Sequence, residues 1–107
     1  MVHKRHEVSL EMRTKMLDWM IEVLSSYKCK ESTWFISAEV MDSYLMKEEK
    51  ELSNKDVHLL GVTCMLIASK YEEVNPISIT TFQAKIAHGK LSKDNIRAME
   101  YSILYAL

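Results

Sequence analysis

The stretch of residues 57–68 constrains the fold of this chain more than any other feature. It is apolar apart from His58 and Thr63, and its apolar side chains would cover every side of a helix. A membrane span needs roughly 20 such residues, so a shorter run indicates a helix buried in a protein core. The sequence therefore predicts a central helix around which the other segments pack.

Helix-capping residues, namely Ser9, residues 30–32, Ser53 or Asn54, Ser78 and Ser92, divide the chain into five helical segments. Only 2 glycines and 1 proline interrupt 107 residues, which favours helices joined by short connections over strands joined by tight turns. A chain of this length, with 48% hydrophobic residues, forms one core. We predict a single all-α domain over residues 1–107, with helices over about residues 9–24, 30–46, 54–72, 78–87 and 92–107.

Charge and cysteine content bound the possible functions. The formal net charge is −1, from 14 basic and 15 acidic residues spread along the chain, which disfavours a dedicated nucleic-acid binder. The start of the chain has no leader-like apolar segment. Cys29 and Cys64 are far apart, and Cys64 lies in the apolar run, so buried thiols are favoured over a disulfide or a metal site. We expect a soluble, intracellular protein with no membrane or nucleic-acid partner.

The first helical segment has more apolar surface than one core contact requires. Its apolar residues cover an arc of about 200° around the helix. The part of this arc that exceeds one core contact, here called the shoulder, comprises Met12, Met16, Trp19 and Val23. Either this shoulder is an exposed binding strip with a polar rim, or its side chains pack under a neighbouring helix. Periodicity alone leaves both readings open.

Two charged residues occur within apolar helix faces. Arg13 lies in the middle of the first apolar arc, where an unpaired guanidinium would be costly, and Asp42 lies among apolar residues in the second helix. We predict a buried Arg13–Asp42 ion pair. The alternative is that both side chains reach solvent separately.

The third helix ends in an abrupt charge cluster. Lys70 suits the negative end of the helix dipole, whereas Glu72 and Glu73 oppose it. These acids either serve a partner or form an ordinary solvated helix end.

The sequence offers no catalytic constellation. Its four histidines are not at metal-ligand spacing, neither cysteine has a histidine partner, and no glycine-rich loop could cradle a phosphate. The adjacent acids Glu72 and Glu73 point in different directions on a helix and are poor general acid/base partners. We predict a protein that is not an enzyme, without metal or cofactor.

Four segments resemble the cyclin box of A- and B-type cyclins, and together they cover about residues 7–107. Residues 12–23 resemble its MR-x-x-L-x-DWL-x-E-V opening, and residues 40–45 its I-D-R-F-L segment. Residues 60–73 are close to its L-V-G-x-x-x-M-L-L-A-S-K-Y-E-E signature, and residues 96–100 resemble the R-x-M-E that opens its fifth helix. The resemblance implies a five-helix N-terminal cyclin box with a central third helix and an Arg13–Asp42 ion pair.

The resemblance also implies a partner, a cyclin-dependent kinase. Lys70 and Glu100, from two separate helices, would meet at the surface and form the polar anchors for the regulatory helix of the kinase and the segment before it. Binding would activate the kinase by shifting its population toward the active state. The surrounding contact surface would comprise Ile67, Tyr71, Glu73, Phe82, Ile103 and Leu104.

A second implied site is the patch with which such cyclins dock substrates and inhibitors bearing Arg-x-Leu motifs. Met12, Met16, Trp19 and Glu22 match this patch. Lys15 stands where the family usually has an apolar residue, and His58 where a glutamine is common. These two departures are expected to alter docking while leaving kinase binding intact.

The rival interpretations are a non-activating cyclin-fold scaffold or a transcription-factor-like adaptor and, more distantly, a small metal-dependent enzyme. The adaptor predicts a basic face, which the near-neutral charge disfavours. Cyclins of this type usually carry a second five-helix repeat, so the chain is expected to be a fragment of a cell-cycle regulator found in the nucleus and cytoplasm.

Overall fold

The structure is a computed structural model and describes residues 10–47 and 54–106. Within these ranges every regular element is a helix, which confirms the predicted all-α class. The elements are, in chain order, α1 (Leu10–Ser26), α2 (Glu31–Lys47), α3 (Asn54–Glu72), α4 (Ile79–Thr81), the π-helix η2 (Phe82–Ile86) and α5 (Lys93–Ala106).

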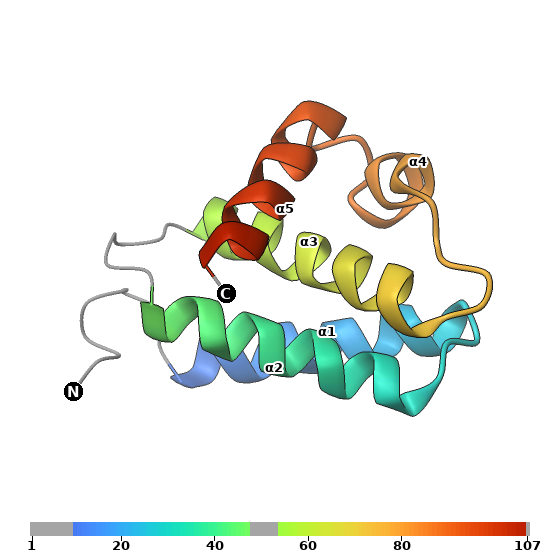
Figure 1. The fold of residues 1–107 in the computed structure, drawn as a ribbon, viewed down its shortest axis with the longest axis horizontal. Helices are drawn as coiled ribbons and strands as arrows, with labels where there is room; N and C mark the ends of the chain where they lie inside the picture. Colours follow the sequence, from blue (N-terminus) through green and yellow to red (C-terminus); the bar gives the residue numbers. More distant parts are fainter. Residues whose placement is uncertain (1–9, 48–53, 107) are drawn as a thin grey trace.

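Helix α3 is central, as its apolar run predicts. It lies between the pair α1 and α2 on one side and α5 with α4 on the other (Figure 1). Between Val57 and Ser69 nearly every side chain is buried, and only His58, Leu59 and Ile67 are partly exposed. The neighbouring helices contribute the rest of the core, from Met20, Leu24, Met41, Tyr44, Phe82, Ile86, Ile96 and Ile103.

The predicted fourth helix is a composite. Ser78 caps its start, accepting a hydrogen bond from the Thr81 N–H at 3.1 Å. After one turn of α4 the chain widens into η2, where the Ala87 N–H donates to the Phe82 carbonyl five residues earlier at 2.8 Å. Gly89 then adopts φ +72°, a left-handed conformation that glycine accepts without strain, and closes the segment.

The start of α5 agrees with its predicted cap. The Ser92 Oγ accepts a hydrogen bond from the Asn95 N–H at 3.0 Å. The predicted caps Ser9 and Ser53 lie outside the described residues. Residues 47–50 are all charged and are expected to form a solvated connection; Lys47 is instead the last residue of α2, and the other three lie outside the described residues.

Arg13 and Asp42 form the predicted ion pair, which joins α1 to α2. The Arg13 Nε and Nη2 donate to the two carboxylate oxygens of Asp42 at 2.8 and 2.6 Å, a bidentate arrangement. This hydrogen bonding raises the pKa of the Arg13 guanidinium. The side chains are 35% and 41% exposed, so the prediction that the pair is buried was wrong. Trp34 adds a second link between the helices by donating from Nε1 to the Leu17 carbonyl at 3.1 Å.

Both cysteines are free thiols. Cys64 is fully buried in α3, and burial strongly raises the pKa of its thiol. Cys29 is partly buried between α1 and α2, and its pKa is raised by desolvation and by the nearby carboxylate of Glu73. Both groups remain protonated at neutral pH, in keeping with the predicted structural role of Cys64.

Candidate functional site

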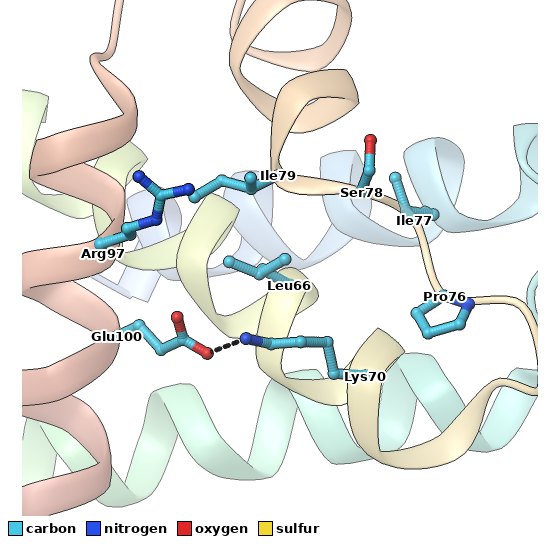
Figure 2. A pocket seen from close by; sticks show the side chains of 8 residues that line it. All are labelled: Leu66, Lys70, Pro76, Ile77, Ser78, Ile79, Arg97 and Glu100. Atoms are coloured by element: carbon cyan, nitrogen blue, oxygen red, sulfur yellow. Dashed lines mark ion pairs between the residues drawn. The ribbon is translucent and has the colours of Figure 1, made fainter.

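An ion pair between Lys70 and Glu100 joins the last turn of α3 to α5. The Lys70 Nζ lies 2.5 Å from the Glu100 Oε2. The two side chains come from helices far apart in sequence, and they meet where α5 crosses α3 (Figure 2). Lys70 remains 52% exposed, whereas Glu100 is only 16% exposed. The predicted meeting of these two residues at the surface is therefore observed, with the lysine as the more accessible member.

A shallow hollow of about 340 Å³ lies beside this ion pair. Leu66 and Lys70 of α3 line one side, Arg97 and Glu100 of α5 another, and the connection at residues 76–79 the third (Figure 2). The connection is fixed because the buried Ser69 hydroxyl accepts a hydrogen bond from the Ile77 N–H at 2.7 Å. The hollow therefore has apolar walls and a charged rim, in a fixed position next to the ion pair.

Exposed apolar side chains flank the ion pair on both helices. Tyr71 is 83% exposed, next to Lys70, and Leu104 is 57% exposed, one turn after Glu100. Ile67, one turn before Tyr71, is partly buried. Exposed apolar side chains gathered in this way are typical of a protein-binding site.

Glu72 and Glu73 have a structural role that the sequence did not indicate. The Glu73 carboxylate accepts hydrogen bonds from the Lys30 N–H at 2.7 Å and from the buried hydroxyl of Thr33. Ser32 donates to the Glu72 carboxylate at 2.7 Å. Both acids therefore lie at the start of α2, whose positive dipole end attracts them and offsets their unfavourable position at the end of α3. The hydrogen bonds from Thr33 and Lys30 lower the pKa of Glu73.

Five side chains of the predicted docking patch lie along α1, and the sixth, His58, contacts Trp19 from α3. Met12, Met16 and Trp19 are partly buried against the core, so this apolar shoulder packs partly against other helices and leaves the rest of its surface exposed. The rings of Trp19 and His58 are in tilted contact, with centroids 5.1 Å apart. Desolvation lowers the pKa of His58, with smaller electrostatic contributions from the nearby side chains of Lys90 and His88.

Two further residues of the patch are exposed. Lys15 lies 3.6 Å from Glu11, one turn earlier on α1, in a solvated ion pair. Glu22 is exposed further along the same helix. Met16 reaches α3 at Gly61, where a Cβ atom would stand 2.6 Å from the Met16 sulfur, so the glycine allows this close approach.

Among the described residues, no group of three or more histidine, cysteine, aspartate or glutamate side chains is arranged to hold a metal ion. No helix within residues 10–47 and 54–106 is both long and apolar enough to cross a membrane.

Comparison with known proteins identifies the family. The family model described as the cyclin N-terminal domain matches residues 1–107, the whole chain. The chain belongs to the cyclin family. Its helices α1 to α5 are accordingly the helices of a cyclin box, with α3 at the centre.

The similar proteins include A- and B-type cyclins. The putative cyclin-A3-1 of Arabidopsis thaliana is 38% identical over 94% of this chain and 28% of its own length. The G2/mitotic-specific cyclin-B of Marthasterias glacialis is 37% identical over 94% of this chain and 25% of its own length. The S-phase entry cyclin-5 of Saccharomyces cerevisiae is 40% identical over 90% of this chain and 21% of its own length. The chain thus spans about a quarter of the length of these cyclins.

Two of the residues predicted to contact the kinase are buried in the core. Phe82 and Ile103 are both 0% exposed, so the prediction that they lie on the contact surface of this cyclin box was wrong. Phe82 opens η2 and packs into the core, and Ile103 faces α3 from the inner side of α5. Helical periodicity places Ile103 on the face opposite the exposed Tyr101 and Tyr105. This pattern could have predicted that Ile103 is buried whereas Leu104 is exposed.

Proposed function

We propose that this cyclin domain binds a cyclin-dependent protein kinase and helps to activate it during the cell cycle. The observation that supports this most is the Lys70–Glu100 ion pair, set between the exposed Tyr71 and Leu104. An ammonium group has three donors and a carboxylate has two acceptor oxygens, so the pair keeps hydrogen-bonding capacity for a partner's backbone. The exposed apolar side chains would supply most of the buried area.

The proposed mechanism is allosteric and needs no catalytic group on this chain. A kinase that alternates between inactive and active states is shifted by any ligand that binds the active state better. The α3–α5 surface would supply this difference in affinity by holding the regulatory helix of the kinase in its active position. As a cell-cycle regulator, the protein is proposed to act in the nucleus and cytoplasm.

An exchange of the two charges tests this proposal. Lys70→Glu combined with Glu100→Lys keeps opposite charges facing each other within the chain, so the link between α3 and α5 is retained. It reverses the positions of donor and acceptor that a partner would meet. We expect co-purification with a cyclin-dependent kinase to be lost while the helical circular dichroism is unchanged.

A matched exchange serves as the control. Glu11→Lys combined with Lys15→Glu reverses an exposed ion pair on α1, at 3.6 Å, without changing the net charge. This variant should bind the kinase as the original chain does. Native binding by the Lys70/Glu100 exchange would refute the assignment of the anchors.

We also propose that the surface patch around Trp19 on α1 docks proteins bearing Arg-x-Leu motifs. Met12, Met16 and Trp19 offer partly exposed apolar surface for the leucine, and the exposed Glu22 offers a partner for the arginine. Trp19→Ala should weaken the binding of an Arg-x-Leu peptide and leave kinase binding intact. Lys15→Ile should strengthen it, because it removes a cation that repels the arginine of the motif. Equal peptide affinity in the original chain and both variants would contradict docking at this patch.

A further inference from the structure

Arg97 stands out among the charged residues around the hollow. Its side chain is exposed and extends from α5 across the hollow toward Ile79 (Figure 2). The acid nearest in the hollow, Glu100, is already paired with Lys70 at 2.5 Å. Within the part of the chain that the structure describes, Arg97 has no ion-pair partner. An arginine that the protein itself leaves unpaired is available to an external anion.

The charge of the hollow supports the same conclusion. Its lining includes two cations, Lys70 and Arg97, and a single acid, Glu100. Because Lys70 and Glu100 neutralise each other, the guanidinium of Arg97 supplies the net positive charge of the rim. The net charge of the whole chain is −1, so this positive rim is a local feature and not a share of a general basic surface.

The walls of the hollow indicate what accompanies the anion. Leu66, Pro76, Ile77 and Ile79 provide the apolar surface of the hollow, and the guanidinium extends toward Ile79 (Figure 2). Apolar walls disfavour a small hydrated anion and favour a peptide segment whose apolar side chain enters the hollow. A guanidinium at the rim can then bind a neighbouring carboxylate through two parallel hydrogen bonds.

We propose that Arg97 is a specificity-determining residue, which selects kinase segments that carry an acidic side chain beside the apolar residue seated in the hollow. The inference rests on the proposed kinase binding and adds to it. Lys70 and Glu100 would hold the backbone of the partner, which every kinase has. Arg97 would bind a side chain, and the identity of that side chain differs between kinases.

The test compares kinase affinities of the intact cyclin domain and two variants, by isothermal titration at low and high salt. Arg97→Gln removes the charge, and Arg97→Glu reverses it. We expect about tenfold weaker binding for Arg97→Gln and a larger loss for Arg97→Glu. Both losses should shrink at high salt, because the interaction lies at an exposed rim. Lys85→Gln, which removes an exposed cation that does not line the hollow, should leave the affinity unchanged.

A charge exchange across the interface completes the test. Acidic residues of the bound kinase segment are replaced one at a time by lysine, and one of these replacements should restore binding to Arg97→Glu. If the original chain binds a kinase and Arg97→Gln binds it equally well, the role of Arg97 is refuted and kinase binding stands. If the original chain binds no cyclin-dependent kinase, the proposed function fails and this inference fails with it.

Discussion

Glu73 offers the sharpest test of how the site is held together, because it directly follows the last residue of α3 and its side chain bonds to the start of α2. Its carboxylate accepts from the Lys30 N–H at 2.7 Å and from the hydroxyl of Thr33, which is 0% exposed. Loss of a helix cap costs about 1 kcal/mol, and a buried hydroxyl left without an acceptor costs about 1 kcal/mol more. We therefore expect Glu73→Ala to lower the free energy of unfolding by about 2 kcal/mol.

Thermal unfolding followed by circular dichroism measures this loss. In a domain of this size about 1 kcal/mol corresponds to a change of about 4–8 °C in the melting temperature, so Glu73→Ala should melt about 8–16 °C lower. Glu39→Ala is the control, since Glu39 is an exposed acid on the outer surface of α2. A melting temperature within about 1 °C of the original chain would refute the capping role.

The contribution of Glu73 should also depend on pH. Its pKa is lowered in the folded state from the ordinary value of 4.5, so its charge stabilises the fold fully above that value. The stabilisation is lost as the pH falls through the lower folded-state pKa. Glu73→Gln cannot titrate, so its stability should approach that of the original chain in acid and fall below it at neutral pH. Parallel pH profiles would show that the charge of Glu73 contributes nothing.

Three further predictions concern other contacts. Asp42→Asn should lower the free energy of unfolding by about 1 kcal/mol in urea titrations, because it weakens the half-exposed bidentate pair with Arg13, and an unchanged midpoint would contradict this role. The pKa of His58 should lie below 6.5 in NMR titrations, because its ring is desolvated. Trp19→Ala lets water reach the ring and should move this pKa closer to 6.5. A pKa at or above 6.5 in the original chain would contradict the desolvation of His58. Gly61→Ala should disturb the side chain of Met16, whose sulfur lies 2.6 Å from the added carbon, and Met16→Ala in the same chain should relieve this clash in thermal melts.

Local patterns in the sequence were sufficient for the helices and for the Arg13–Asp42 pair, whereas the roles of Lys70 and Glu100 came from the resemblance to cyclins. The apolar run at residues 57–68 could belong only to a buried helix, and Arg13 and Asp42 each stood out as a charge on an apolar face. The hydroxyl of Ser78 marked a helix start because its hydrogen bond reaches only three residues ahead. Such features depend on neighbours in the chain, which a single sequence displays directly.

Features that depend on packing between helices could not be predicted in this way. Glu73 opposes the dipole of α3, and only the position of α2 reveals the N–H and hydroxyl groups that it accepts from. The extent of burial was also misjudged, since Arg13 and Asp42 lie at the edge of the α1–α2 contact while Phe82 lies in the core. Arg97 went unnoticed because an arginine on a polar helix face is ordinary until its neighbours are known to be paired elsewhere.

Hydrogen exchange of the complex with a cyclin-dependent kinase tests the central claim most directly. We expect binding to slow exchange of backbone amides in the second half of α3, in the connection at residues 76–79 and in α5. Exchange in the first turns of α1 should change little. Slower exchange confined to α1 and α2, with α3 and α5 unchanged, would contradict kinase binding at the surface around Lys70 and Glu100.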